Sequence, residues 1–227
     1  MAGSPSGVIL DVDGTLVDSN AAHARAWADV LREAGYDVAV DRLQRLIGMG
    51  TDKLLPAAIG VEKDSPAGQR LSQRRKQVFH DRYLSRLQPT PGARELLDRL
   101  RAEGLALMIA SSAEGDELAG LLAVCGATDL APRTPPPSAV GASKPEPDVV
   151  QAALARLDRP AAEVLMLGDT PYDVEAAQRA GVGIIGLGCG GWSDAELRGA
   201  LAIYAHPADL LAHYAASPLA RQGATAS

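Results

Sequence analysis

The chain has 227 residues, enough for one complete hydrophobic core and a smaller appended unit. Its composition, 47% hydrophobic and 22% charged, is that of a soluble globular protein. The net charge of −6 argues against a nucleic-acid-binding protein, because such proteins present a basic face to the phosphate backbone. An aromatic content of only 4% leaves little material for stacking on bases.

Cysteine usage and the apolar segments argue against two further classes of protein. Cys125 and Cys189 lie far apart and outside any CxxC spacing, so we expect neither a disulfide framework nor a zinc site. No apolar run approaches the roughly 20 residues that span a bilayer. The N-terminal residues lack the basic start and apolar stretch of a signal peptide. We therefore expect a cytoplasmic protein with no membrane partner, and either a monomer or a homodimer fits the sequence.

The first part of the chain begins with a strand and continues with helices. A buried strand is predicted over residues 8–10, and it runs directly into the acidic segment 11–15. A helix is predicted over residues 21–34 and ends at Gly35, as helices often do. From there to about Pro89 the hydrophobic periodicity is helical throughout, and no strand is predicted.

Strands and helices alternate in the remainder of the chain. The predicted strands lie at residues 105–110, 164–167 and 182–187, and the predicted helices at 93–103, 115–124, 148–157 and 174–180. A proline-rich stretch at residues 132–137 is predicted to be a loop. The alternation implies parallel strand pairing and therefore a doubly wound, Rossmann-like α/β fold.

The helical interval separates the first strand from the rest of the α/β pattern, so we expect an inserted domain. The α/β core is assigned to residues 1–18 and 89–227, and an all-helical cap to residues 19–88. A cap that closes over the core can exclude bulk water and supply substrate contacts. Residues from about 218 to 227 are expected to form a frayed tail.

Polar clusters follow three of the predicted strands, and a fourth precedes a helix. They are Asp11 and Asp13 after the first strand, Ser111 and Ser112 after the second, Asp169 and Asp173 after the third, and Lys144 between prolines and acids. Ligands of doubly wound sheets bind at the carboxyl ends of the strands. We therefore expect the four clusters to meet in one crevice.

The residue types in these clusters suit phosphoryl chemistry. The carboxylates of Asp11, Asp13 and Asp169 form an all-oxygen set of the kind that binds Mg²⁺. The Ser111 hydroxyl and neighbouring N–H groups can hold phosphoryl oxygens, and Lys144 can neutralise the charge that builds during transfer. Each cluster alone has an ordinary interpretation as a turn, a helix cap or a solvated charge. Their occurrence together favours an enzyme.

The segment Asp11-Val12-Asp13-Gly14-Thr15-Leu16-Val17-Asp18-Ser19 resembles the first motif of the haloacid dehalogenase superfamily. Ser111 resembles the serine of its second motif, Lys144 the lysine of its third, and Gly168-Asp169-Thr170-Pro171-Tyr172-Asp173 its fourth. The resemblance covers residues 8 to about 211. It implies a magnesium-dependent phosphatase of the branch that contains phosphoglycolate phosphatases and beta-phosphoglucomutases, which have a small helical cap.

The resemblance also implies how the chain handles a phosphoryl group. Asp11 would be the nucleophile that forms an aspartyl-phosphate, and Asp13 the general acid and then the general base. The phosphoryl group would be bound by Ser111, helped by the backbone N–H groups of Val12 and Ser112.

A metal ion completes the site that the resemblance implies. Mg²⁺ would lie on Asp11, the backbone carbonyl of Asp13, and Asp169. Asp173 would assist either as a metal ligand itself or by hydrogen bonding to one of the ligands. Lys144 would hold both the nucleophile and the phosphate.

Departures from other branches of the superfamily favour hydrolysis of a phosphate monoester. Dehalogenases lack the second acidic residue of the first motif and need no metal. Phosphomutase relatives are similar around His23 and Trp27, but carry an arginine where Thr51 stands and a glutamate where Gly168 stands. A sugar phosphomutase is therefore the second hypothesis, and a non-catalytic binder of a phosphorylated ligand or a protein is the third. The expected partner is a small phosphorylated metabolite.

Substrate specificity is assigned to the cap, where the candidate contacts are His23, Gly48, Met49, Gly50, Thr51 and Lys53. The two glycines leave backbone N–H groups approachable. His23 has packing beside Trp27 as its alternative role. The run Arg74-Arg75-Lys76 is interpreted mainly as solvated helix charge, with Lys76 as a weaker candidate contact. Phosphoglycolate, sugar phosphates and nucleotides all stay open as substrates, and residues 135–137 and Cys189 receive no role.

Overall fold

The computed structural model describes residues 5–136 and 139–220. Within them, strands β1 (Gly7–Leu10), β2 (Ala106–Ile109), β3 (Val164–Gly168), β4 (Gly183–Leu187) and β5 (Ala202–Tyr204) form one sheet. The order is β2-β1-β3-β4-β5, and every pairing is parallel. The chain therefore leaves β1 in one direction to form β2 and returns on the other side of β1 to form β3. This reversal opens a crevice at the carboxyl ends of β1 and β3.

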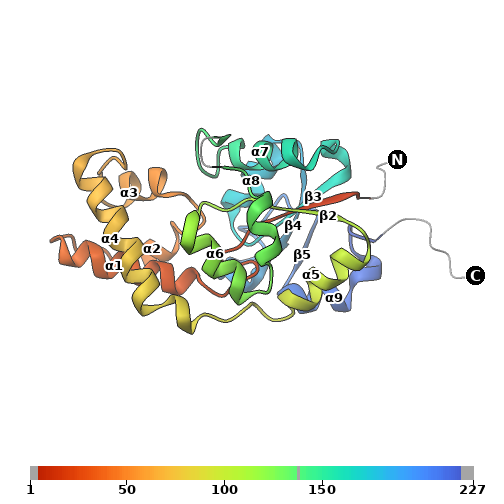
Figure 1. The fold of residues 1–227 in the computed structure, drawn as a ribbon, viewed down its shortest axis with the longest axis horizontal. Helices are drawn as coiled ribbons and strands as arrows, with labels where there is room; N and C mark the ends of the chain where they lie inside the picture. Colours follow the sequence, from red (N-terminus) through yellow and green to blue (C-terminus); the bar gives the residue numbers. More distant parts are fainter. Residues whose placement is uncertain (1–4, 137–138, 221–227) are drawn as a thin grey trace, which may run out of the picture.

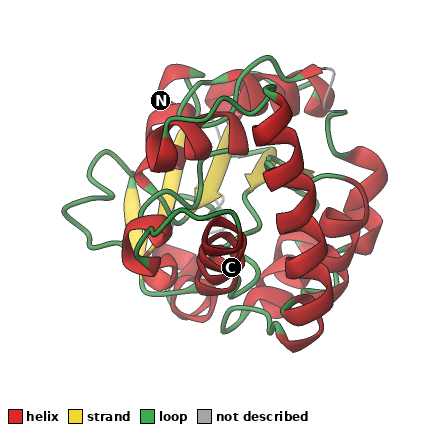
Figure 2. Ribbon diagram, turned by 90° about the vertical axis from the view of Figure 1, so that its left-hand side faces the viewer, coloured by secondary structure: helices red, strands yellow, loops and turns green. Residues whose placement is uncertain are grey.

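Helices cover both faces of the sheet (Figures 1 and 2). On one face lie α5 (Ala93–Ala102), α6 (Gly115–Val124) and α9 (Pro207–Ala212), and on the other lie α7 (Asp148–Leu157) and α8 (Pro171–Arg179). Val8 and Leu10 belong to the first of these cores, and Ile9 between them belongs to the second. Because both faces are covered, β1 reads as a continuous apolar run. The doubly wound α/β fold predicted from the sequence is confirmed.

A helical layer lies beyond the carboxyl edge of the sheet, at the left of Figure 1. It consists of α1 (Asn20–Glu33), α2 (Val40–Gln44), α3 (Thr51–Ile59) and α4 (Pro66–Arg82). α1 packs against α2 and α4. Trp27, Leu31 and Phe79 are buried in the same hydrophobic core as the side chains of α5, α6 and α9. We call this layer the cap. Short 3₁₀ helices complete the structure: η1 (Leu84–Arg86), η2 (Thr128–Arg133), η4 (Ala161–Glu163), η5 (Gly188–Gly190) and η6 (Tyr214–Ala216).

The predicted strands are confirmed to within one residue at either end, but β5 and α9 are absent from the prediction. Three half-buried residues and a six-residue helix are too short to show a hydrophobic period. α8 begins at Pro171, not at residue 174 as predicted. The reason is a capping box, in which Thr170 accepts from the N–H of Asp173 and the Asp173 carboxylate accepts from the N–H of Thr170.

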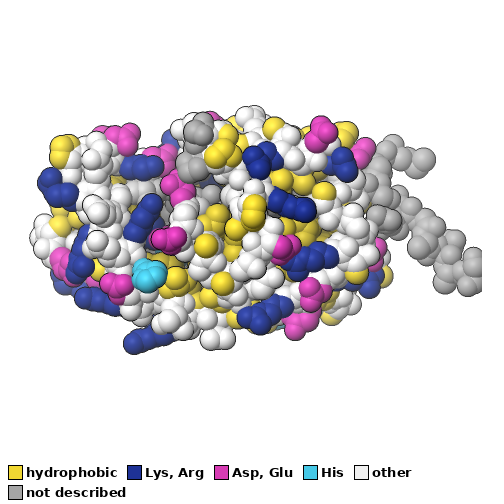
Figure 3. Space-filling model, viewed as in Figure 1, with side chains coloured by type: hydrophobic (Ala, Val, Ile, Leu, Met, Phe, Trp, Pro, Cys, Tyr) yellow, Lys and Arg dark blue, Asp and Glu magenta, His cyan; other side chains and the backbone are white. Residues whose placement is uncertain are grey.

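Two other predicted segments are confirmed only in part, and some of their residues lie outside the described part of the chain. Residues 128–133 form η2, so the proline-rich loop starts later than predicted, and Pro137 lies outside the described residues. In the segment expected to fray, Leu219 is buried, and residues 221–227 lie outside the described residues. None of the helices in the described part of the chain is both long enough and apolar enough to cross a membrane. On the face drawn in Figure 3, acidic and basic side chains are interspersed.

Candidate active site

Asp11 and Asp169 lie at the carboxyl ends of the two strands that flank the crevice. The N–H of Asp11 donates to the carbonyl of Leu167 (3.0 Å), so the ladder between β1 and β3 continues one residue past β1. Asp169 follows the last residue of β3, and its side chain is completely buried. The strand-end position predicted for both carboxylates is where the structure places them.

Lys144 reaches the same point from the loop that precedes α7. Its Nζ donates to Asp11 Oδ1 (2.5 Å), to Asp173 Oδ1 (2.7 Å) and to the carbonyl of Ala110 (3.3 Å). All three ammonium hydrogens therefore have acceptors, although only 2% of the side chain is exposed. Burial alone would lower the pKa of Lys144, but Asp11 and Asp173 raise it overall, so the cation is retained.

The buried carboxylates repel one another. Burial raises the pKa of Asp11 to about 7, and Asp173 and Asp13 raise it too, while Lys144 acts in the opposite direction. Burial, together with Asp11 and Asp173, holds the pKa of Asp169 well above its usual range. More negative charge is gathered here than one lysine can balance.

A divalent cation fits this cluster. Carboxylate oxygens of Asp11, Asp169 and Asp173 lie within 4.8 Å of one another, and an all-oxygen set suits a hard ion. Two glycines make room beside Asp169: a Cβ on Gly14 would lie 2.2 Å, and on Gly190 1.7 Å, from its Oδ2. A bound cation would also reverse the repulsion that raises the pKa values of these acids. Of the three carboxylates predicted from the sequence to form the metal site, Asp11 and Asp169 belong to this cluster. The Asp13 carboxylate does not, and Asp173 is the third member.

Thr15 and Asn20 orient Asp169, and neither role was predicted from the sequence. Thr15 Oγ1 donates to Asp169 Oδ1 and Asn20 Nδ2 to Asp169 Oδ2, each at 2.9 Å. These bonds favour the carboxylate form and act against the raised pKa of Asp169. Asn20 is the first residue of α1, so the start of the cap contacts the buried Asp169 carboxylate directly.

Asp13 turns away from the other acids and is held by the first turn of the cap. Its Oδ1 accepts from Ser19 Oγ (2.5 Å) and lies 2.7 Å from His23 Nε2. A carboxylate can only accept, so His23 carries a proton on Nε2. Burial acts to raise the pKa of Asp13, but His23 and the bonds from His23 and Ser19 lower it overall. Phe79 stacks on the imidazole at 4.0 Å and fixes its plane.

Arg75 and Glu117 form a second charged pair at the site, and neither was predicted. Arg75 Nη1 donates to both Glu117 oxygens at 2.8 Å and lies 3.4 Å from His23 Nδ1. Interpreting the run at 74–76 as solvated charge is therefore wrong for Arg75, which is buried. The helical period contained the signal, because Arg75 continues the buried stripe of Leu71, Val78 and Phe79 on α4.

These side chains enclose a small cavity of about 40 Å³. Its lining from the core consists of Asp11, Asp13, Ser112, Glu117 and Lys144, and its lining from the cap consists of His23, Trp27, Ile47, Gly48, Met49, Thr51, Leu54 and Arg75. Four of the six cap residues predicted to contact substrate line the cavity: His23, Gly48, Met49 and Thr51.

Several predicted site residues lie off the cavity lining. Gly50 packs against Ser143, where a Cβ would approach to 2.5 Å, and Lys53 is not part of the lining. Ser111 Oγ accepts from the N–H of Ala113 (3.0 Å), which leaves its hydroxyl hydrogen for another acceptor.

In the described part of the chain, the backbone N–H groups expected to bind phosphate have no competing partner. Within the described residues, neither the N–H of Val12 nor that of Ser112 donates to another protein group. Val12 is buried, and a buried N–H group without an acceptor is costly unless a ligand or water provides one.

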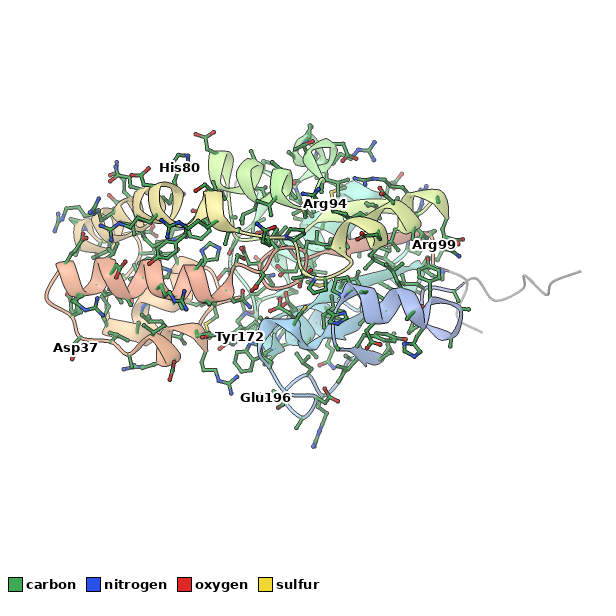
Figure 4. The ribbon with its side chains drawn as sticks, turned by 90° about the horizontal axis from the view of Figure 1, so that it is seen from below. Asp37, His80, Arg94, Arg99, Tyr172 and Glu196 are labelled. Atoms are coloured by element: carbon green, nitrogen blue, oxygen red, sulfur yellow. The ribbon has the colours of Figure 1, made fainter. Side chains whose placement is uncertain are left out.

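The cap also contacts the core at a second place, formed by the start of α8 and the residues that follow η5. The guanidinium of Arg45 lies 4.2 Å from the Trp192 ring centroid and 3.0 Å from Glu196 Oε1. Tyr172 donates its hydroxyl to the carbonyl of Arg45 at 2.6 Å, and Tyr172 and Glu196 lie on the same side of the molecule (Figure 4). The cap thus covers the cavity in this arrangement.

Comparison with known proteins agrees with this geometry. A model of the haloacid dehalogenase-like hydrolase family matches residues 8–187. A phosphoglycolate phosphatase of Yersinia pestis is 32% identical over 215 residues, which cover 92% of this chain and 90% of that protein. A beta-phosphoglucomutase of Bacillus subtilis is 27% identical over 191 residues, which cover 81% and 83% of the two chains.

The crystal structure of a hydrolase from Pseudomonas syringae superposes with a TM-score of 0.80 at 32% identity, and the match covers 92% of this chain and 97% of that one. The family match spans the sheet from β1 to β4 and includes the cap. With the four motifs gathered at one edge of that sheet, these similarities show that the chain belongs to the haloacid dehalogenase-like hydrolase family.

Proposed function

We propose that this chain is a Mg²⁺-dependent phosphatase that hydrolyses a small-metabolite phosphate monoester through an aspartyl-phosphate on Asp11. The observation that carries the proposal is the position of the Asp11 carboxylate. It lies on the cavity lining, 2.5 Å from a buried ammonium and within the acidic cluster that fits a cation. A carboxylate between two positive charges is suited to attack an anionic phosphoryl group.

The first step transfers the phosphoryl group to the enzyme. A carboxylate oxygen of Asp11 forms a bond to phosphorus, and the bond between phosphorus and the alcohol oxygen breaks. Asp13 gives its proton to the departing alcohol. Lys144, Ser111 and the N–H groups of Val12 and Ser112 would stabilise the negative charge on the phosphoryl oxygens.

The second step returns the enzyme to its starting state. Water attacks phosphorus, its proton passes to Asp13, and the bond to Asp11 breaks to release phosphate. The proton taken from water replaces the proton given to the alcohol. After the first step Asp13 is a carboxylate and can accept this proton, and its lowered pKa keeps it ionised until water attacks.

Asp11 and Asp169 would hold the metal ion, with the carbonyl of Asp13, and Asp173 would act mainly by positioning Lys144. Both oxygens of Asp173 already accept hydrogen bonds, from Lys144 at 2.7 Å and from the Thr170 hydroxyl at 2.7 Å. When bound, Mg²⁺ supplies positive charge that orients the phosphoryl group and lowers the pKa values of its ligands.

A sugar phosphomutase is the alternative, and the similarity to the Bacillus subtilis beta-phosphoglucomutase supports it. A mutase must hold a second phosphate while the first is transferred. Thr51, which lines the cavity, offers a hydroxyl rather than a cation for that purpose. Hydrolysis is therefore favoured. Conversion of a hexose 1-phosphate to the 6-phosphate, dependent on a bisphosphate activator, would establish the mutase instead.

The test is phosphate release from a panel of monoesters by the purified chain with Mg²⁺, ranked by kcat/KM. We expect turnover of p-nitrophenyl phosphate and of at least one metabolite, and none from Asp11→Asn at equal concentration. Absence of phosphate release from the whole panel would refute the proposal.

A further inference from the structure

Arg75 of α4 and Glu117 of α6 are a buried ion pair in the wall of the cavity that contains Asp11 and Asp13. Arg75 Nη1 contacts Oε1 and Oε2 of Glu117, each at 2.8 Å. Only 11% of the arginine side chain and 9% of the glutamate side chain are exposed. Neither charge has a part in the phosphoryl transfer described above. The pair is therefore available to act on the other half of the substrate.

The rest of the lining offers no unpaired lysine or arginine to a leaving group. Among the lining residues, all of which lie in the described part of the chain, Lys144 is the other such cation, and it is bound to Asp11 and Asp173. Apart from Arg75, the part of the lining that the cap contributes is mostly apolar. It consists of the apolar side chains of Trp27, Ile47, Met49 and Leu54, together with the Thr51 hydroxyl, the His23 imidazole and Gly48.

We infer that this wall selects phosphate monoesters whose leaving group is uncharged and bears hydroxyl groups, and that Glu117 rejects leaving groups with a second anionic group. The inference rests on the proposed function, because it concerns the alcohol half of the same substrate. It assigns Glu117 as a specificity-determining residue.

The charge balance of the pair gives the physical reason. An anionic leaving group that approaches Arg75 also approaches Glu117, in a site where little water screens the repulsion. The anionic group can form an ion pair with the Arg75 guanidinium only by displacing Glu117, and this leaves the buried Glu117 carboxylate without its cation. A hydroxyl group can donate to Glu117 or accept from Arg75 without breaking the pair.

The size of the cavity narrows the class further. A cavity must have a volume of at least about 10–15 Å³ to hold one water molecule. A cavity of about 40 Å³ therefore holds a phosphoryl group and few further atoms while the cap stays in place. Within the class that the Arg75–Glu117 pair selects, the cavity therefore favours the smallest leaving groups, the short diols and triols.

The experiment compares two esters of similar size in the presence of Mg²⁺. 2-Phosphoglycolate has a leaving group that ends in a carboxylate, and 2-hydroxyethyl phosphate has one that ends in a hydroxyl. We expect kcat/KM of the wild-type chain to be at least about tenfold higher for the hydroxyethyl ester, as a charge repulsion at a few ångströms allows. Glycerol 3-phosphate against 3-phosphoglycerate provides a second pair with the same expected direction.

Variants of the ion pair identify the cause of the preference. Glu117→Gln keeps the shape of the side chain but removes its charge, so the ratio of the two kcat/KM values should move toward phosphoglycolate by at least about tenfold. A double variant, Arg75→Gln with Glu117→Gln, removes both charges and should bring the ratio back to within about threefold of the wild type. Glu114→Gln is the matched control, because Glu114 is an exposed acid at the start of α6 and lies off the cavity lining.

Contrary results separate this inference from the proposed function. A wild-type preference for the carboxylate ester in both pairs would overturn the inference alone, since phosphatase activity would still be present. An equal loss for both esters in Glu117→Gln would also overturn it, because that is the mark of a purely structural contact between cap and core. If Glu117→Gln does not fold, the wild-type ratios decide. Failure to hydrolyse any monoester would overturn the proposed function as well.

Discussion

Lys144 Nζ lies 2.5 Å from Asp11 Oδ1, so the proposed nucleophile is held by a cation that is itself almost completely buried. Asp173 holds the same ammonium from the other side at 2.7 Å. In the proposed mechanism the lysine has two functions. It opposes the burial that raises the pKa of Asp11, and it leaves positive charge beside the incoming phosphoryl group.

Replacing this lysine should remove the nucleophile by protonation. Lys144 lowers the pKa of Asp11, so Lys144→Met should raise that pKa above its present value of about 7 and leave Asp11 neutral at neutral pH. We expect kcat/KM to fall by about 10²–10³-fold or more, the loss that follows removal of one charge-stabilising donor. Lys76→Met is the control, because Lys76 lies on α4 next to Arg75 but off the cavity lining. Loss of less than about tenfold would show that Lys144 is not needed.

The contact between His23 and Asp13 should appear in the pH dependence of kcat. His23 lowers the pKa of Asp13, so His23→Ala should raise it and move the acidic limb of the pH–rate profile to higher pH. We also expect kcat to fall by about 10–100-fold, because Asp13 loses its orientation. The exposed His80 offers the matched variant, His80→Ala, which should leave the profile in place. An unmoved limb in His23→Ala would limit His23 to packing.

Metal binding should change the pH dependence of stability. The folded-state pKa of Asp11 is raised to about 7, so the folded metal-free chain binds this proton more tightly than the unfolded chain does. Its free energy of unfolding should therefore fall as pH rises from about 4 to about 7. Mg²⁺ should raise the melting temperature more at pH 7.5 than at pH 5. At one hundred times its dissociation constant, bound Mg²⁺ adds about 2.7 kcal/mol to the free energy of unfolding.

Asp169→Asn separates metal binding from general ionic effects. It removes one charge from the buried cluster, so the metal-free variant should be at least as stable as the wild type at pH 7.5. The stabilisation by Mg²⁺ and the phosphatase activity should both be lost. A variant that retains the full Mg²⁺ shift would place the ion elsewhere.

The two thiols should be unreactive in the folded chain. Burial raises the pKa of Cys189 to about 12 and that of Cys125 to about 11, so the thiolate fraction near pH 8 is very small. Cys189 also donates to the carbonyl of Gly14 at 3.1 Å. Iodoacetamide at pH 8 should label neither residue rapidly until guanidinium unfolds the chain, as mass spectrometry would record. Rapid labelling of Cys189 in the folded state would contradict its raised pKa.

The parts of the site that follow strands could be predicted from the sequence. Asp11 and Asp169 each come directly after a continuous apolar run, and the carboxyl ends of parallel strands share one edge, so their meeting followed from local pattern and topology. The same reasoning placed Ser111 correctly at the end of β2 but could not show that its hydroxyl accepts from Ala113.

The contacts between cap and core could not be predicted in the same way. Arg75 pairs with Glu117, 42 residues away, and Arg45 packs on Trp192 across the junction. Such pairs depend on how two packed units meet, and no short-range period in the sequence encodes that. Asn20 was missed for a related reason: a residue at the start of a helix is ordinarily interpreted as a cap, whereas here it donates to Asp169.

The central claim is that the phosphoryl group passes through Asp11, and trapping it there is the most direct test. Asp13→Ala should still accept a phosphoryl group from p-nitrophenyl phosphate, whose leaving group needs little protonation, but should release it slowly because no base activates water. After an acid quench, mass spectrometry should find one phosphoryl group on the peptide that contains Asp11, and none in Asp11→Asn combined with Asp13→Ala. Phosphorylation at another residue, or full turnover by Asp11→Asn, would contradict the account.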